Sequence, residues 1–314
     1  MAVAARSGLL VIDKPSGPTS HDVVAQVRRS LHMREVGHAG TLDPMASGVL
    51  LVMLGECTKL SRFLALESKS YRAWIRLGVG TDTDDAEGKV RSECVLPEAL
   101  RAELAVLEKG AGEALAIQAA LERERMRTLQ RPPSFSAIKQ QGMRAYVRAR
   151  RGQVVELPDR EVHVEQLRVL GASADRGELE LELSVSKGYY VRSLARDLGV
   201  SLGVPSHLSG LRRTRVASYT LGQAVRLEQV ASELGLMLSL ADVARGAMPT
   251  VVLTDQGVRR ALWGQAMSEA DFDSPPSDQT SAWLDRAGEL VAVGDRSAGR
   301  PTVVRAFSRP EVVC

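Results

Sequence analysis

The sequence predicts an α+β fold, in which long strands form a sheet and helices occur separately along the chain. The clearest strand is 179–185, where Leu and Val alternate with Glu and Ser, the period of a half-buried strand. A helix is predicted after Pro97, because Leu100, Leu104 and Leu107 follow at helical spacing. Short apolar runs separated by turns after about residue 250 predict a small β-rich second domain.

The first elements predicted are a strand, a turn and a helix. The apolar run 9–12 ends in the turn-forming residues 13–18, which include Pro15, Gly17 and Pro18. Thr19 or Ser20 can cap the helix that follows. The apolar face of that helix consists of Val23, Val24, Val27 and Leu31.

The remaining elements follow in the same way. A Gly-rich loop at 36–44 precedes a buried-strand candidate at 49–54, and a β-like run at 71–79 leads into a polar turn at 81–88. Residues 109–131 favour helix, and another helix passes through Leu194, Leu198 and Leu202. The short strands of the second domain are expected at 251–253, 282–284, 290–293 and 303–307.

Charge is distributed unevenly along the 314 residues. The net charge is only +3, but residues 125–151 carry eight basic side chains and no acidic one. From residue 250 onward there are seven basic and nine acidic residues. This asymmetry indicates that the earlier part of the chain binds an anionic polymer. A solvated helix face explains one basic cluster taken alone equally well.

Several functional classes are disfavoured. The three cysteines are widely spaced and form no CxxC pair, which argues against a zinc site or a disulfide framework and favours the reducing cytoplasm. The acidic run 82–87 has Glu87 where a calcium loop needs glycine, so we expect no metal. No signal peptide or apolar run long enough for a membrane is present, and we expect no membrane association.

The loop at 36–44 is the strongest candidate for chemistry. Asp43 precedes Pro44, which disfavours helical backbone at the aspartate, while Gly37 and Gly40 permit close approaches and unusual φ angles. A carboxylate held in this way can act as a nucleophile or as an acid or base. On its own, the loop is better explained as an ordinary surface turn, because Asp, Gly and Pro are common turn residues.

Two further segments suit nucleic acid. Residues 186–192 place Lys187 and Arg192 around two tyrosines, and rings interleaved with cations suit bases and phosphates. Arg192 could equally steady a buried carboxylate through a bidentate contact, and a charged strand edge is the simpler alternative. Residues 130–139 combine a stiff proline pair with basic flanks, which also suits a rigid spacer loop.

Taken together, these segments resemble one family in order. The chain resembles the TruB-type tRNA pseudouridine synthases of bacteria, strongly over residues 8–225 and more weakly beyond. The segments that carry the resemblance are Leu10 to Gly17 with Thr19-Ser20, Gly37 to Pro44 with Ala46 to Leu50, Gly55 to Lys59, Lys69 to Tyr71, Leu77-Gly78 with Thr81 to Asp84, Pro132 to Lys139 with Ala145-Tyr146, Ser186 to Arg192 with Asp197 to Gly199, and Leu211 to Arg213.

The resemblance implies a fold and a reaction. It implies an α+β catalytic domain at 1–247 with a central mixed, largely antiparallel sheet, a cleft and an RNA-clamping insertion at about 109–152. Residues 248–314 are similar to a PUA RNA-binding domain. The implied reaction isomerises uridine to pseudouridine at position 55 in the T loop of tRNA, without a cofactor. We expect a cytoplasmic protein that acts as a monomer.

The resemblance also implies site residues. Asp43 is the implied catalytic carboxylate, Tyr71 lies against the target base as a candidate for removing the C5 proton, and Arg192 pairs with Asp43. Tyr190 shapes the pocket and His38 meets the RNA beside the extruded base. The other implied members of the site are Lys14 and Leu211, and the residues expected at the RNA backbone are Arg131, Lys139, Arg144, Arg148, Arg150 and Arg151.

Three positions depart from the family pattern. Ala39 stands where threonine is usual, Phe135 where tyrosine is common, and Tyr189 where threonine is common. None of these is the implied carboxylate. Phe135 lacks a hydroxyl and Tyr189 adds bulk near the pocket, so both bear on RNA contacts.

Elementary chemistry agrees with this reaction. A C–N glycosidic bond breaks and a C–C bond forms to the same base, so no redox cofactor is required. The base must be flipped out to be reached, and an ionised carboxylate can stabilise or trap the oxocarbenium-like sugar. Attack on ribose C1′, attack on C6 of the base and removal of a sugar proton are all open to Asp43. The alternative functions are an RNA-binding protein that helps tRNA fold, and a glycoside- or nucleoside-cleaving hydrolase that uses Asp43.

Overall fold

The computed structural model describes 7–64, 68–110, 112–136, 157–274, 276 and 279–307, together with the backbone of 139–140 and 143–144. The chain forms two compact units. Unit 1 comprises residues 1–43, 49–66 and 217–314, and unit 2 comprises residues 44–48 and 67–216. Because these units group 217–314 with the N-terminal segment, the domain boundary at residue 248 stays a prediction.

Unit 2 is built on a mixed, largely antiparallel sheet. Strand β12 (Glu178–Val185) pairs antiparallel with both β11 (Val164–Ser173) and β4 (Lys69–Leu77), and β4 pairs antiparallel with β13 (Ser206–Val216). The start of β3 (Ser47–Leu54) runs parallel to β13. This arrangement confirms the predicted mixed sheet.

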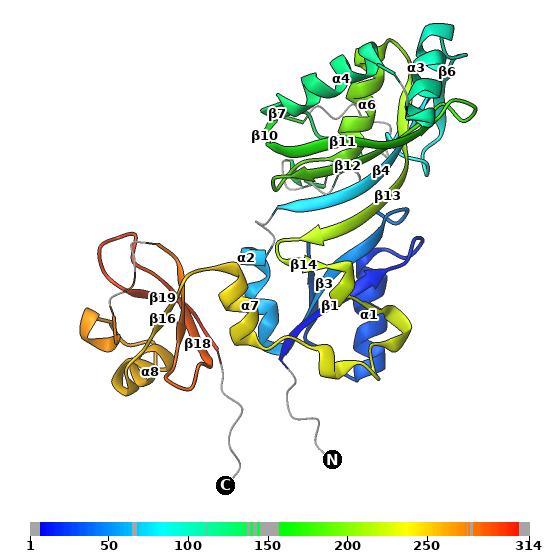
Figure 1. Ribbon diagram of the computed structural model, residues 1–314. Coiled ribbons are helices and arrows are strands. Elements are labelled where there is room, and N and C mark those ends of the chain that lie inside the picture. Colours follow the sequence, from blue (N-terminus) through cyan, green and yellow to red (C-terminus); the bar gives the residue numbers. More distant parts are fainter. Residues whose placement is uncertain are drawn as a thin grey trace. The chain divides into compact units, whose positions relative to one another are not determined.

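Three helices lie over one face of this sheet, as Figure 1 shows. They are α3 (Glu98–Lys109), α4 (Leu115–Arg125) and α6 (Val191–Leu202). The alternation at 179–185 works as predicted, because its Leu and Val side chains are buried, three of them completely. The small strands of unit 2 are β5 (Val79–Thr81), β6 (Val90–Glu93), β7 (Leu129–Gln130), β8 (Lys139–Gln140), β9 (Met143–Arg144) and β10 (Arg160–Glu161).

Unit 1 begins with the predicted strand, turn and helix. Thr19, rather than Ser20, caps α1 (Ser20–Leu31) and forms a capping box with Asp22. The rest of β3 pairs antiparallel with β2 (Val36–Ala39). The other elements of this part are β1 (Gly8–Lys14), the 3₁₀ turn Gly55–Leu60, α2 (Ser61–Leu64), β14 (Tyr219–Thr220), β15 (Val225–Arg226), which is parallel to β1, and α7 (Leu240–Ala247).

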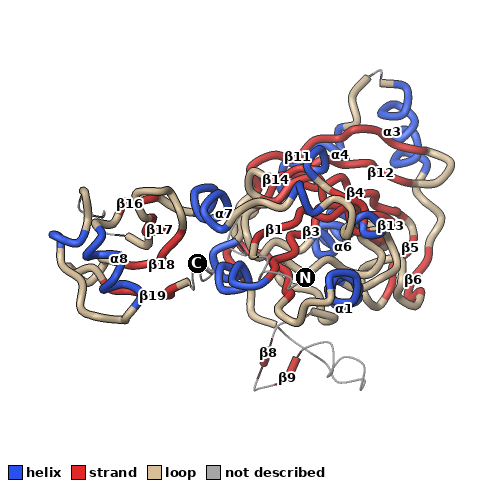
Figure 2. The backbone as a smooth tube through the Cα atoms, turned by 90° about the horizontal axis from the view of Figure 1, so that it is seen from below, coloured by secondary structure: helices blue, strands red, loops and turns tan. Residues whose placement is uncertain are grey.

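The C-terminal part of unit 1 has a four-stranded sheet of its own, shown with α8 (Asp255–Leu262) in Figure 2. Its core surrounds Trp283, which is fully buried and meets Phe272 edge-on at 4.9 Å. A Cβ at Gly294 would come within 1.8 Å of the Trp283 ring, so only glycine fits there. The predicted β-rich region is confirmed by β16 (Thr250–Val252), β17 (Ser281–Leu284), β18 (Leu290–Asp295) and β19 (Thr302–Ala306).

Candidate active site

Asp43 lies in the loop that connects β2 and β3. Two cross-strand pairs, His38 with Val52 and Ala39 with Leu51, bring the ends of this loop together. Gly40 has φ +76°, a left-handed conformation that favours glycine. The side chain of Asp43 is half-buried. The loop therefore has a defined backbone path, as the glycines and proline of the sequence predicted.

Ser20 fixes this loop through its neighbour Leu42. The Ser20 hydroxyl accepts a hydrogen bond from the Leu42 N–H at 2.9 Å and donates to the Leu42 carbonyl at 3.1 Å. Both residues are buried. Because Thr19 caps the helix, Ser20 can bind the main chain one residue before Asp43. Sequence reasoning identified Ser20 as an alternative cap and as part of a family motif, but it did not predict this contact.

The other expected residues of unit 1 have defined surroundings. The ring of His38 meets the ring of His21 edge-on, with centroids 5.2 Å apart. Lys14 is fully buried and its ammonium donates to the carbonyls of Pro15 and Pro18, at 2.8 and 2.7 Å. Lys14 thus stabilises the turn before α1, and its predicted place in the site remains a prediction.

Tyr71 and Leu211 lie on adjacent strands of unit 2. Tyr71 is on β4, opposite Leu183 of β12 and Arg213 of β13, and is buried. Leu211 is on β13, opposite Ala73 of β4. Both side chains are thus anchored in the regular part of the sheet.

Arg192 is the second residue of α6, and Tyr190 is the N-cap residue of that helix. The Arg192 guanidinium donates to the carbonyls of Thr83 at 3.2 Å and Phe135 at 3.0 Å. It is only 7% exposed. A buried guanidinium is expected to have its planar donors satisfied and its charge balanced.

Asp85 supplies charge next to Arg192. The Asp85 carboxylate lies 3.5 Å from the Arg192 guanidinium and is itself only 4% exposed. It also accepts hydrogen bonds from the Thr83 hydroxyl at 2.5 Å and from the Glu87 N–H at 3.1 Å. Sequence reasoning predicted a polar turn here and rejected a calcium loop, but it did not predict the contact of Asp85 with Arg192. The signal was present as an Asx-type turn inside a β-hairpin.

Asp84 faces the next arginine of α6. Its carboxylate lies 3.6 Å from the guanidinium of Arg196, and its backbone has φ +61°. Burial raises the pKa of Asp84 to about 6, while Arg196 and Arg192 oppose the rise. Asp84 and Asp85, which are adjacent in the 81–88 turn, thus each face one arginine of α6.

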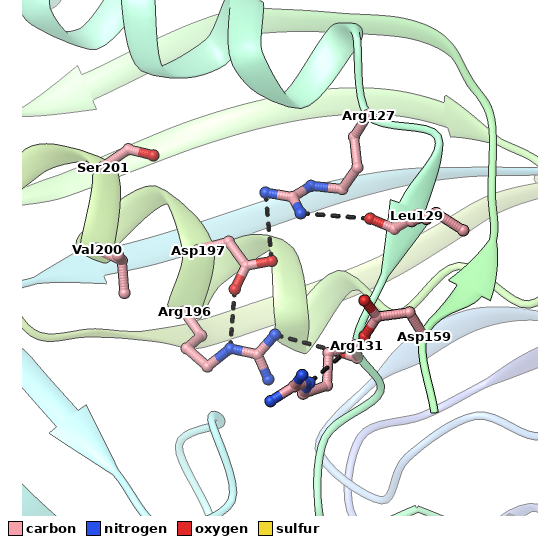
Figure 3. A pocket seen from close by; sticks show the side chains of 8 residues that line it. All are labelled: Arg127, Leu129, Arg131, Asp159, Arg196, Asp197, Val200 and Ser201. Carbon is pink, nitrogen blue, oxygen red and sulfur yellow. Dashed lines mark hydrogen bonds and ion pairs between the residues drawn. The ribbon is translucent and has the colours of Figure 1, made fainter. Parts of the chain in front are cut away.

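A pocket of about 530 Å³ opens beside α6 (Figure 3). Arg196 donates to Asp197 at 2.8 Å, and Arg127 lies 3.4 Å from Asp197. Arg131 lies 3.4 Å from Asp159 across the pocket. The remaining lining residues are Leu129, Val200 and Ser201. Three guanidinium groups and two carboxylates therefore share one concave surface.

Tyr189, one of the three departures, is buried beside this network. Burial strongly raises the pKa of its phenol, and Glu124 adds to the rise. Its hydroxyl therefore stays protonated at neutral pH, and the ring contributes packing.

The predicted RNA-backbone residues are described only in part. The Arg131 side chain is 65% exposed at the pocket. Lys139 and Arg144 are opposite each other in the β8–β9 pair, and only their backbone is described. Arg148, Arg150 and Arg151 lie outside the described residues.

The predicted site residues are divided between the two units. Asp43, His38 and Lys14 belong to unit 1, while Tyr71, Tyr190, Arg192 and Leu211 belong to unit 2. Across the described part of the chain, no cluster of three or more His, Cys, Asp or Glu side chains could hold a metal ion. Nor is any helix among those residues both long and apolar enough to cross a membrane.

Comparison with known proteins identifies the family. Residues 28–191 match the model of the TruB family pseudouridylate synthase N-terminal domain, and residues 192–242 match that of the tRNA pseudouridylate synthase B C-terminal domain. The chain is 44% identical to tRNA pseudouridine synthase B of Thermobifida fusca over 317 residues, which cover 96% of this chain and 99% of that protein. It is 40% identical to the protein of the same name from Mycobacteroides abscessus over 302 residues, or 95% of each.

The fold also matches solved structures. A chain in a Cbf5-Nop10-Gar1 complex superposes with a TM-score of 0.65 at 24% identity, covering 98% of this chain and 85% of that one. At this identity, the likeness concerns the fold alone. The fold, the ordered motifs and the length of the matches to named relatives all agree: the chain belongs to the TruB family of pseudouridylate synthases.

Proposed function

We propose that this protein isomerises uridine to pseudouridine at position 55 in the T loop of tRNA, without a cofactor. The observation that carries the proposal is the full-length match to proteins named tRNA pseudouridine synthase B. The fixed Asp43 loop supports it, because Ser20 holds the main chain beside the aspartate. The paired, buried Arg192 supports it too, since an arginine of this kind can balance a carboxylate.

In the proposed reaction, the target uridine is flipped out of its stack. Asp43 meets the uridine as an ionised carboxylate, and Arg192 pairs with Asp43 to keep it ionised. Tyr71 lies against the base and Tyr190 shapes the pocket. The carboxylate stabilises or traps the electron-poor centre that forms when the glycosidic bond breaks. The detached base then rejoins through C5, and the C5 proton is lost.

Basic side chains of residues 125–151 are proposed to bind the phosphates of the T arm. Each phosphate contact releases counterions from the RNA, so binding should weaken steeply as salt rises. Replacing Arg148, Arg150 and Arg151 together should make the dependence of binding on salt less steep, and an unchanged slope would place the RNA elsewhere. In the same proposal, residues 248–314 are a PUA-like RNA-binding domain and the enzyme is a cytoplasmic monomer.

The test is tritium release from C5-labelled uridine in a T-arm stem-loop. Wild type should release tritium, and Asp43→Asn, which keeps the shape of the side chain but not its charge, should release none. A stem-loop with cytidine at the target position is the matched substrate control. Equal release by both proteins would show that the reaction does not require the Asp43 carboxylate.

The same assay separates the alternative functions. An RNA-binding protein that only helps tRNA fold would bind the stem-loop tightly and form no pseudouridine. A nucleoside-cleaving hydrolase would release free uracil, which chromatography of the reaction mixture would detect.

A further inference from the structure

The side chain of Gln130 binds both main-chain polar groups of Tyr190. The Tyr190 N–H donates to Gln130 Oε1 at 2.8 Å, and Gln130 Nε2 donates to the Tyr190 carbonyl at 3.1 Å. Gln130 is only 1% exposed. A carboxamide that supplies one acceptor and one donor to the same residue fixes that residue much as a neighbouring strand would.

Tyr190 is a position where such a contact matters. It is the N-cap residue of α6, with extended backbone at φ −111° and ψ 114° and no capping hydrogen bond from its own side chain. Serine, threonine, asparagine and aspartate are the residues that normally fix a helix start through their side chains. Gln130 therefore fixes the start of α6 from another segment, sixty residues away in the sequence.

Gln130 is itself anchored where β7 pairs with β10. It is the last residue of β7, where it lies opposite Arg160 of β10. The pair is extended by a hydrogen bond of 2.9 Å from the Val162 N–H to the Thr128 carbonyl. Strands β7 and β10 flank residues 131–159, so their pairing brings the two ends of that segment together.

The residues after Gln130 bind the first turns of α6 through their carbonyls. The Arg131 carbonyl accepts from the Ser193 hydroxyl at 2.8 Å and from the Arg196 guanidinium at 3.1 Å, the latter drawn in Figure 3. The Phe135 carbonyl accepts from Arg192 at 3.0 Å. Pro132 and Pro133 lie between these carbonyls, are buried, and have a nearly fixed φ.

Arg127, which precedes β7 in the sequence, connects that strand to α6. Its guanidinium donates to the Leu129 carbonyl at 3.4 Å and lies 3.4 Å from Asp197 of α6. It also pairs with Glu124, a fully buried carboxylate at the end of α4. Residues on both sides of Gln130 in the sequence are therefore bonded to α6: Arg127 before it and Arg131 after it.

We propose that Gln130 is a positioning residue of the reaction. Through Tyr190 it sets the position of the first turn of α6, and with it the guanidinium of Arg192. The inference rests on the proposed function, because Tyr190 and Arg192 are proposed to contact the target nucleotide and Asp43.

The first test is Gln130→Met, which keeps the length of the side chain and removes both hydrogen bonds. Single-turnover and steady-state kinetics on the T-arm stem-loop should give a kcat that is about 10- to 100-fold lower, the scale expected when a reacting group is displaced by a fraction of an ångström to an ångström. KM should stay within about twofold of wild type, because the phosphate contacts remain. Hydrogen exchange at the Tyr190 amide should quicken.

The second test is Gln130→Glu, in which the pH decides whether the side chain can form both hydrogen bonds to Tyr190. A protonated carboxyl supplies the same acceptor and donor as the carboxamide, whereas an ionised one only accepts. The ratio of variant kcat to wild-type kcat should therefore fall as pH rises. Taking the ratio removes the titration of groups that both proteins share, including Asp84 beside α6.

The matched control is Ser206→Ala. The buried Ser206 hydroxyl donates to the Ala195 carbonyl at 2.6 Å, so this variant also loses a buried hydrogen bond to α6, but near the middle of the helix. It should lower stability and leave kcat within about twofold of wild type.

The outcomes separate the inference from the proposed function. If wild type forms no pseudouridine, the proposed function fails, and unchanged Tyr190 exchange in Gln130→Met would overturn the positioning role as well. If wild type is active and Gln130→Met keeps its kcat, only the role of Gln130 is overturned. Equal losses of kcat in Gln130→Met and Ser206→Ala would reduce Gln130 to a stabilising residue.

Discussion

The Asp43 loop and the 81–88 turn each present a carboxylate, and the two are fixed in different ways. At the Asp43 loop of unit 1, the fixed group next to the aspartate is the main chain of Leu42, which Ser20 binds through two hydrogen bonds. At the 81–88 turn of unit 2, the Asp85 carboxylate itself is held by Thr83, Glu87 and Arg192. A residue can therefore be positioned through its backbone or through its charged end.

The difference matches the proposed roles of the two carboxylates. The main-chain contacts beside Asp43 fix the backbone from which its carboxylate is proposed to meet the substrate. A carboxylate that only orients an arginine can have its oxygens engaged by the protein. We therefore expect substitutions at the two turns to have different consequences.

The largest effect is expected from Asp85→Asn. The amide keeps a similar shape but leaves the buried Arg192 with less compensation of its charge. Breaking a buried ion pair in this way costs about 3–5 kcal/mol of stability. Urea unfolding should show a loss of this size, and pseudouridine formation should fall even where the protein remains folded. A double-mutant cycle with Arg192→Gln should show strong coupling, whereas additive losses would mean that the pair contributes little.

A smaller effect is expected from Ser20→Ala at the Asp43 loop. Two hydrogen bonds to a buried main chain are lost, which costs about 1–3 kcal/mol. Thr19→Ala is a matched control, because it removes the cap of the same helix at a cost of about 1 kcal/mol and leaves Leu42 bound. We expect kcat to fall more in Ser20→Ala than in Thr19→Ala. Similar values of kcat would show that the Ser20 contacts stabilise α1 without positioning Asp43.

The smallest effect is expected from Asp84→Asn and depends on pH. The pKa of Asp84 rises from 3.8 to about 6 on folding, so the folded state holds the proton more tightly than the unfolded state. The protonated Asp84 side chain stabilises the wild-type fold below about pH 4, and this contribution is lost as pH rises to about 6. Over that pH range, the free energy of unfolding of Asp84→Asn relative to that of wild type should therefore increase. The increase should be about 1 kcal/mol, because the side chain is partly exposed to solvent. Urea unfolding of both proteins at pH 4, 5, 6 and 7 measures this difference. A constant difference would show that Asp84 titrates alike in both states.

The sequence predicted the parts of this protein that depend on neighbours along the chain. Alternation at 179–185 identified β12, and helical spacing identified α3 and α6, because burial of one face imposes a period on the sequence. Gly40 and Pro44 predicted the defined loop around Asp43 for an equally local reason. Motif order was enough to predict the family and the mixed sheet, and short apolar runs separated by turns predicted the β-rich C-terminal region.

Only the tertiary structure showed which distant residues hold the candidate site residues in place. Ser20 and Leu42 are 22 residues apart in the sequence, and Gln130 and Tyr190 are 60 apart. The turn at 83–85 is more than a hundred residues from Arg192. These partners are ordinary polar residues with no periodic pattern to distinguish them. Their roles follow from packing, because burial leaves each polar group only the few partners that the fold brings within reach.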